Sequence, residues 1–188
     1  MLHIVYGGSA SGKSSYAESF AMSLQGEGRL LYIATMYPYK WNTTEIDPET
    51  MQRIERHRAM RADKGFDTVE CYRHVEHIVA KRQDVLLLEC MSNLLANEMY
   101  LEPDSNAGSD MAETMSPVSN KIVQALIDLS TRVQELVIVT NDVFSDGGSL
   151  TYDESTREYV KNLAEINCAL AREAATVTEV VCGTWSWP

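Results

Sequence analysis

The strongest constraint on the fold of this chain is an eight-residue motif, GGSASGKS, at positions 7–14. The motif directly follows an apolar, strand-like run at 2–6 and precedes a segment of helical periodicity. Glycines at this point let the backbone wrap around a phosphate group, while successive N–H groups and the helix N-terminus point at it. The motif therefore predicts a phosphate-binding loop (P-loop) for a nucleoside triphosphate, formed by Gly7, Gly8, Ser9, Ala10, Ser11, Gly12, Lys13 and Ser14.

Two side chains of the motif have expected roles in phosphate chemistry. Lys13 is expected to reach the terminal phosphates as a mobile positive charge, which makes it a candidate catalytic residue. The Ser14 hydroxyl is expected to coordinate Mg²⁺ that bridges two phosphate oxygens. The motif thus implies a nucleoside triphosphate substrate that binds together with Mg²⁺.

A P-loop enzyme also needs a carboxylate at the end of a neighbouring strand to hold the metal. Glu89 is the candidate, because it ends the apolar run 85–88, where an isolated buried carboxylate would be costly. Asn141 and Asp142 follow another apolar run and form a second candidate at the same edge of the sheet. An ordinary turn explains that second pair equally well.

Short apolar runs alternate with longer segments of helical period, which predicts an α/β fold. Several runs do not alternate with polar residues, as expected for strands that are covered on both faces of a parallel sheet. We therefore predict a single domain over residues 1–188 with a P-loop NTPase-type, mostly parallel sheet and helices on both of its faces. The expected strands are 2–6, 30–35, 85–89, 136–141 and 177–182, with 66–70 as an added edge strand.

The expected helices are 14–24, 49–61, 72–81, 92–101, 118–133 and 155–175. The second helix has a clear start, because Asp47 can cap it and Pro48 suits its first position. It has only a thin apolar stripe, Met51 and Ile54, so we expect weak packing and movement as a unit. The long connections are 36–47, 102–117 and 142–152, of which 102–117 is polar and expected to be disordered.

Composition excludes some classes of partner. The chain has 188 residues, 16 of them basic and 27 acidic, and its formal net charge of −11 argues against general affinity for nucleic acid or anionic membranes. It contains neither an apolar run of 18 residues nor a basic leader, so we expect no stable membrane insertion and a cytoplasmic location. Its four cysteines are widely spaced, which favours reduced thiols.

A cluster of four arginines and a histidine lies in the helix predicted after Pro48. Arg53, His57 and Arg61 recur every four residues and therefore share one face of that helix. Such a face suits a triphosphate, whose α-phosphorus a histidine can attack. From spacing alone, an exposed helix whose charges pair with Glu49 and Glu55 is the favoured interpretation.

Together these segments resemble the bifunctional adenosylcobinamide kinase/adenosylcobinamide-phosphate guanylyltransferase family. The resemblance rests on the order and spacing of the P-loop, YIAT at 32–35, RI at 53–54 with HR at 57–58 and Arg61, TVE at 68–70 and LEC at 88–90. It continues through VTNDV at 139–143, EIN at 165–167 and VVCG at 180–183, and so covers nearly the whole chain.

The resemblance implies a cobalamin biosynthesis and salvage enzyme. Such an enzyme phosphorylates adenosylcobinamide with ATP or GTP, then transfers GMP from GTP to adenosylcobinamide phosphate and releases pyrophosphate. By the same resemblance His57 carries the GMP, and the protein is a homo-oligomer, a trimer. Nucleotide contacts are implied for the P-loop and for Ile33, Ala34, Thr35, Arg58, Ala59, Met60, Arg61, Glu70 and Glu89. A carboxylate at Glu70 suits guanine, because it can accept hydrogen bonds from N1–H and the exocyclic amine.

The sequence departs from the family pattern at Ala10, at Phe66 and in the tail at 184–188. These departures bear on nucleotide preference and subunit packing. Trp185 and Trp187 of that tail suit the core, tail docking or a subunit contact equally. Two other functions stay open. One is a P-loop small-molecule kinase without guanylyl transfer, and the other is a nucleotide-dependent regulatory module that acts through 102–117.

Two further groups of residues favour structural roles. Cys71, His74 and His77 overlap only partly on one helix face, so packing or surface positions are favoured over a metal site. Met91 and Met99 are expected in the core, with contact to a bulky corrinoid as the alternative.

Overall fold

In the computed structural model, which describes residues 1–40, 43–101, 115–143 and 152–186, seven strands form one sheet in the order β3-β2-β4-β5-β1-β6-β7. Neighbouring strands are parallel except for β6 and β7, which are antiparallel. The strands are β1 (Leu2–Gly7), β2 (Leu30–Ala34), β3 (Phe66–Glu70), β4 (Val85–Glu89), β5 (Glu135–Asn141), β6 (Thr176–Val181) and β7 (Thr184–Ser186). The prediction of a mostly parallel α/β sheet is confirmed, and β3 is the edge strand expected at 66–70.

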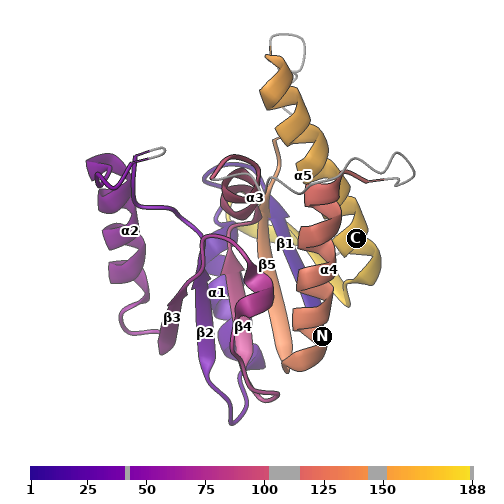
Figure 1. The fold of residues 1–188 in the computed structure, drawn as a ribbon. Coiled ribbons are helices and arrows are strands. Elements are labelled where there is room, and N and C mark those ends of the chain that lie inside the picture. The colour runs from indigo at the N-terminus through magenta and orange to yellow at the C-terminus, as the bar shows by residue number, and fades with distance from the viewer. Residues whose placement is uncertain (41–42, 102–114, 144–151, 187–188) are drawn as a thin grey trace.

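Helices cover both faces of the sheet, as predicted (Figure 1). The helices are α1 (Lys13–Leu24), α2 (Pro48–Arg61), α3 (Met91–Tyr100), α4 (Pro117–Arg132) and α5 (Glu154–Glu173), with a 3₁₀ turn, η1 (Val75–His77), before β4. Helices α3, α4 and α5 share one buried core with the sheet, to which β2 contributes Leu31 and Ile33. Helix α1 shares the other core, to which β2 contributes Leu30 and Tyr32. Because both faces are buried, strands such as β2 are apolar at successive positions.

The turn from β1 into α1 depends on two glycines of the motif. At Gly7, which ends β1, a Cβ atom would lie 2.5 Å from the carbonyl oxygen of Val180. Gly12 caps α1 at a φ of 93°, a left-handed conformation that L side chains rarely adopt. These two positions therefore require glycine for backbone reasons, before any phosphate is considered.

Helix α2 stands beyond β3, away from the other helices (Figure 1). It starts as predicted, because Pro48 is its first residue and the Asp47 carboxylate accepts a hydrogen bond from the Thr50 N–H at 3.3 Å. The Thr50 hydroxyl also donates to this carboxylate, and that side-chain hydrogen bond is the main reason that the pKa of Asp47 is lowered. Arg61 is the buried residue of the helix, so apolar packing contributes little to its attachment.

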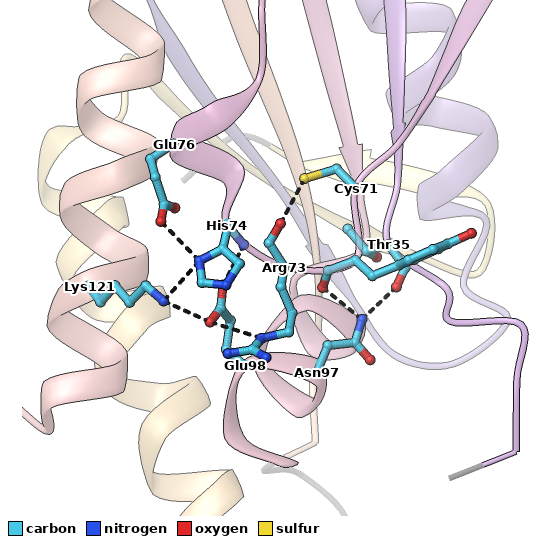
Figure 2. A network of polar contacts seen from close by, with 9 residues as sticks. Thr35, Cys71, Arg73, His74, Glu76, Asn97, Glu98 and Lys121 are labelled. Carbon is cyan, nitrogen blue, oxygen red and sulfur yellow. Dashed lines mark hydrogen bonds and ion pairs between the residues drawn. The ribbon is translucent and has the colours of Figure 1, made fainter. Parts of the chain in front are cut away.

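The predicted helix at 72–81 is wrong, because only η1 is helical there. His74 precedes this turn at a positive φ of 58°, which interrupts a helix. Two side chains of α3 form hydrogen bonds with backbone groups of this segment (Figure 2). The Glu98 carboxylate accepts a hydrogen bond from the His74 N–H at 2.7 Å, and the Asn97 amide donates one to the carbonyl of Tyr72 at 2.9 Å. Tertiary hydrogen bonds thus replace the local helical bonds that the pattern predicted.

The end of the chain adds β7, which pairs with β6 through a turn at Cys182 and Gly183. Trp185 is opposite Val180 in this pairing, so this part of the tail docks on the sheet. Trp187 and most of the connections predicted at 102–117 and 142–152 lie outside the described residues. Within the described ranges, no helix combines the length and hydropathy that crossing a membrane requires.

Candidate functional site

The carboxyl ends of the parallel strands surround a pocket of about 460 Å³, here called the central pocket. Parallel strands place these ends at one edge, where open α/β sheets bind ligands. The central pocket is lined by Ser9, Ala10, Lys13, Ser14, Tyr32, Ala34, Met36, Arg53, Ile54, His57, Arg58, Arg61, Thr68, Glu70, Tyr72, Glu89, Cys90, Ser92, Asn93, Val139, Asn141, Asp142 and Val143.

The P-loop forms one wall of the central pocket. Lys13 is only 9% exposed, and its ammonium group donates to the carbonyl oxygen of Gly8 at 3.0 Å. A backbone hydrogen bond from another segment holds the loop: the Gly183 N–H donates to the carbonyl of Ser11 at 2.8 Å. The backbone and the lysine are therefore arranged as an anion site at the N-terminus of α1.

Glu89 reaches the same pocket from the end of β4 and is 9% exposed. The Tyr32 hydroxyl donates to its Oε2 atom at 3.2 Å. Burial, together with the charge of Glu89, raises the pKa of Tyr32, so the phenol keeps its proton. The pair is therefore a neutral donor facing a carboxylate.

Helix α2 forms the opposite wall. Arg53, Ile54, His57, Arg58 and Arg61 all line the central pocket, so the helix face predicted from the four-residue spacing is present. The pairing with Glu49 and Glu55 that spacing favoured is not the one observed for Arg58, whose ion pair is with Glu70 on β3.

Arg61 is held differently from the other arginines. It is 5% exposed, and its guanidinium carbon lies 3.4 Å from the centroid of the Tyr32 ring, a cation–π contact. Its Nε and Nη1 atoms are buried and have no hydrogen-bond partner in the described part of the chain. Buried N–H donors normally have partners, so this arrangement suits an anionic ligand.

The other residues predicted for the site lie around the pocket rather than in its lining. Ile33 is fully buried in the three-helix core, and Thr35 is fully buried with its hydroxyl donating to the backbone carbonyls of Glu89 and Cys90. Ala59 and Met60 lie on exposed positions of α2. Gly7, Gly8, Ser11 and Gly12 form the backbone of the P-loop. Their nucleotide contacts remain predictions.

Sequence reasoning missed several residues of the lining. Tyr32 was attributed to a buried strand, and Tyr72 to a helix that does not form; the Tyr72 hydroxyl donates to Glu70 at 2.9 Å. Asn141 and Asp142, the second candidate pair, lie at the same edge of the sheet as Glu89, as predicted. The Asn141 amide donates to the Ser92 hydroxyl at 2.6 Å.

A second, larger hollow of about 1490 Å³ adjoins the central pocket, and Glu70 and Tyr72 line both. Its lining residues are Tyr37, Thr43, Thr44, Val69, Glu70, Cys71, Tyr72, Arg73, His74, His77, Ile78, Val79, Tyr100 and Leu101. The 71–78 segment is anchored from below by Glu98, whose buried carboxylate pairs with Arg73 and Lys121 (Figure 2). The wall is therefore fixed by charged contacts to α3 and α4.

Cys71, His74 and His77 make contacts within the protein. The two imidazole rings stack with centroids 5.6 Å apart, and the Cys71 thiol donates to the carbonyl of Arg73 at 3.2 Å. No group of three or more His, Cys, Asp or Glu side chains within the described ranges is arranged to hold a metal ion. Met91 is fully buried, as expected for a residue of the core.

Comparisons with known proteins agree with the resemblance in sequence. A family model described as cobinamide kinase / cobinamide phosphate guanyltransferase (CobU) matches residues 3–186. A protein of Escherichia coli (strain K12) named bifunctional adenosylcobalamin biosynthesis protein CobU is 30% identical over 192 residues, covering 97% of each chain. The protein of the same name from Salmonella typhimurium is 30% identical over 191 residues, again covering 97% of each chain.

Among solved structures, the flagellar accessory protein FlaH from Methanocaldococcus jannaschii aligns with 98% of this chain and 74% of its own. The TM-score is 0.46 and the sequence identity is 12%, values that support no conclusion about function.

The thiol of Cys71 gives a test of the larger hollow. Burial, with the charges of Glu76 and Glu98, raises the pKa of Cys71 to about 11. Only the thiolate is nucleophilic, so alkylation of Cys71 should be slow at pH 8 and should accelerate about tenfold per pH unit towards pH 11. The rate is measured by mass spectrometry of the iodoacetamide-treated protein, with the exposed Cys168 and Cys182 as fast-reacting references. Fast alkylation of Cys71 at pH 8 would contradict the raised pKa of this half-buried thiol.

Proposed function

The chain belongs to the cobinamide kinase / cobinamide phosphate guanyltransferase family, and on this premise we propose that its central pocket performs both transfers. The chain is accordingly an enzyme of cobalamin biosynthesis with kinase and guanylyltransferase activity. The observation that carries the proposal is that Lys13 of the P-loop and His57 of α2 line the same pocket. A phosphate-binding group and a nucleophile can therefore act on nucleotides bound in one place.

In the kinase reaction, the hydroxyl of adenosylcobinamide attacks the γ-phosphorus of ATP or GTP. A new O–P bond forms, the bond to the nucleoside diphosphate breaks, and the hydroxyl proton is released. Lys13 would neutralise charge on the β- and γ-phosphates, and the N–H groups of the P-loop would hold the chain of phosphates in position. The chain's part in this step is positioning and electrostatic stabilisation.

The donor atoms around the P-loop fit Mg²⁺. Ser14, Glu89 and Asp142 contribute oxygen atoms to the lining, the donor type that this cation prefers. Ser14 and Glu89 would hold the ion, directly or through water, and nucleotide phosphates would supply further ligands. The chemistry supplied by an ion held there would be a reduction of the negative charge on the phosphate groups.

In the guanylyl transfer, a ring nitrogen of His57 attacks the α-phosphorus of GTP and pyrophosphate leaves. The histidine then carries GMP through a P–N bond. The phosphate of adenosylcobinamide phosphate attacks this GMP, which gives adenosylcobinamide-GDP and restores His57. Arg53 and Arg61 line the pocket beside His57 and would neutralise the phosphate oxygens during attack.

Glu70 is the residue that we assign to guanine recognition. Its carboxylate already accepts hydrogen bonds from Arg58 and Tyr72. Guanine N1–H and the exocyclic amine are donors of the same kind, so the base can take the place of the Arg58 guanidinium. Such an exchange would release Arg58 towards the phosphates as GTP binds.

The corrinoid substrate is proposed to occupy the larger hollow. At about 1490 Å³ this hollow exceeds the 300–1,000 Å³ that is typical of small-molecule pockets, and a macrocycle is a correspondingly large ligand. Its wall mixes tyrosine rings and apolar residues with the donors Arg73 and His77, which suits a corrin ring that carries amide groups. Since Glu70 and Tyr72 line both spaces, the acceptor would lie next to the nucleotide.

A kinase without guanylyl transfer and a nucleotide-dependent regulator are the two rival functions. Incubation with α-labelled GTP without corrinoid distinguishes them, because only the bifunctional enzyme retains label on the protein, acid-labile and alkali-stable as phosphoramidates are. Corrinoid-stimulated release of ADP or GDP then separates a kinase from a regulator. A trimeric assembly and a cytoplasmic location complete the proposal.

Lys13→Ala should lower the rate of adenosylcobinamide phosphorylation by about 100- to 1000-fold, because it removes the ammonium group that would neutralise charge on the terminal phosphates. The rate is followed as formation of adenosylcobinamide phosphate under saturating ATP. Lys40→Ala is the matched control, since Lys40 is exposed and pairs with Glu45 away from the central pocket. A folded Lys13→Ala protein with near wild-type turnover would refute the P-loop assignment.

His57→Ala should abolish labelling of the protein by α-labelled GTP and formation of adenosylcobinamide-GDP. Transfer of the γ-phosphate to a hydroxyl needs no protein nucleophile, so phosphorylation should persist, lowered only as far as α2 helps to hold nucleotide. Arg56→Ala is the control, because Arg56 is an exposed residue of the same helix outside the pocket lining. If folded His57→Ala protein still became labelled, the carrier would lie elsewhere, with His74 and His77 next to be tested.

Saturating adenosylcobinamide should protect Cys71 from alkylation. At ten times its dissociation constant, a ligand that covers the thiol slows the reaction by about tenfold. The exposed Cys168 on α5 should react at an unchanged rate, which separates local cover from a general gain in stability. Full reactivity of Cys71 in the presence of bound corrinoid would place the acceptor outside the larger hollow.

A further inference from the structure

Tyr32 contacts two residues of the central pocket that the proposed function assigns to different steps. We propose that Tyr32 is a positioning residue for both transfers, with its hydroxyl group orienting Glu89 and its ring supporting Arg61. The inference rests on the proposed function, because it takes Glu89 as the metal-binding carboxylate and Arg61 as the phosphate-binding guanidinium.

The register of the sheet places the phenol beside Glu89. Tyr32 of β2 pairs with Leu87 of β4, and Glu89 is two residues further along β4, so both side chains lie on the same face of the sheet. The hydroxyl donates to Oε2 at 3.2 Å from within the sheet, and the described residues supply no hydrogen bond to Oε1. One carboxylate oxygen is thereby held, and the other is available to a cation in the pocket.

The ring of Tyr32 supports Arg61 without using its donors. The guanidinium carbon lies 3.4 Å from the ring centroid, so a flat face of the cation is covered by the aromatic ring. Its N–H groups point outwards in the guanidinium plane, and Nε and Nη1 have no partner in the described part of the chain. The contact compensates part of the cost of burying the charge and leaves a set of donors for phosphate.

Neighbouring residues restrict the position of the ring. Tyr32 is 4% exposed, and Phe66 of β3 packs against it edge-on, with centroids 6.1 Å apart and an interplanar angle of 82°. Packing on this scale locks the rotamer of a buried side chain. A fixed Tyr32 side chain therefore holds the Glu89 carboxylate and the end of α2 in defined positions. This matters for α2 because the helix has little apolar packing of its own.

The two contacts use different parts of one side chain, so two substitutions separate them. Tyr32→Phe removes the hydroxyl and keeps the ring, and Tyr32→Leu removes both. Loss of a hydrogen bond to a charged group corresponds to about a tenfold effect or more, and loss of a buried cation–π contact to about tenfold. Phe20→Leu is the matched control, because it removes a ring packed against the same core, and its ring contacts are with His3 and Tyr16.

The test measures three quantities on the full chain: the Mg²⁺ dependence of adenosylcobinamide phosphorylation, the rate of protein labelling by α-labelled GTP, and the calorimetric affinity for a non-hydrolysable ATP analogue with and without Mg²⁺. Tyr32→Phe should raise the Mg²⁺ concentration for half-maximal phosphorylation by about tenfold and weaken analogue binding only when Mg²⁺ is present. Excess Mg²⁺ should restore its labelling rate. Tyr32→Leu should be labelled about tenfold more slowly than Phe20→Leu at every Mg²⁺ concentration.

Wild-type Mg²⁺ dependence in Tyr32→Phe, or equal labelling of Tyr32→Leu and Phe20→Leu, would overturn the inference while leaving the proposed function intact. If Tyr32→Leu does not fold, the affinity and Mg²⁺ titration of Tyr32→Phe decide the question. If the wild-type protein neither phosphorylates adenosylcobinamide nor becomes labelled, the proposed function fails, and this inference fails with it.

Discussion

The site depends on one geometric constraint, the alignment of parallel strands in register. Ala34 of β2 pairs with Glu70 of β3 on one side and with Glu89 of β4 on the other, and Gly7 of β1 pairs with Asn141 of β5. Residues that are far apart in the chain therefore reach one edge of the sheet together. Backbone hydrogen bonds and two apolar cores hold this edge, so the positions of the P-loop and of both carboxylates are set by the most stable part of the fold.

Helix α2 is attached by a different physical principle. Its contacts with the rest of the chain include the stacking of Arg61 on Tyr32 and the ion pair of Arg58 with Glu70, while Lys64, just beyond its end, pairs with Glu18 of α1. Exposed ion pairs contribute little to stability, and none of these contacts is an apolar interface. The predicted mobility of α2 follows from this arrangement, since polar contacts can be exchanged for contacts to phosphate at small net cost.

The elements predicted correctly are those with strong local patterns. Central strands such as β2 and β4 were identifiable because burial on both faces makes them continuously apolar. Helix α1 was identifiable because the motif specifies a strand, a turn and a helix. The start of α2 was identifiable from Asp47 and Pro48. The helix predicted at 72–81 failed because Asn97 and Glu98, distant in sequence, bind the backbone of that segment. No local pattern contains that information.

The candidate site shows the same division. Lys13, Ser14 and Glu89 were selected from the motif and from the ends of strands, and all three line the central pocket. Tyr32 was missed as a contact of Glu89 because a tyrosine in an apolar strand indicates only burial. Spacing favoured Glu49 and Glu55 as partners for the charges of this helix, whereas the register of β3 brings Glu70 to Arg58. Spacing along a helix predicts which side chains share a face, but the arrangement of the sheet determines which residues that face contacts.

The charge of the molecule explains why so many donors meet in one place. A chain of net charge −11 repels a triphosphate at long range, so affinity has to come from short-range contacts in the pocket. Among the described residues, Lys13 has only a backbone carbonyl as hydrogen-bond acceptor, and two nitrogens of Arg61 have none. These buried cations are costly in the free protein and become paired when phosphate arrives, so part of the binding energy is relief of a desolvation cost that the fold already bears. The same cations would favour the pyrophosphate leaving group in one reaction and the transferred phosphoryl group in the other, which is how one pocket can serve two chemistries.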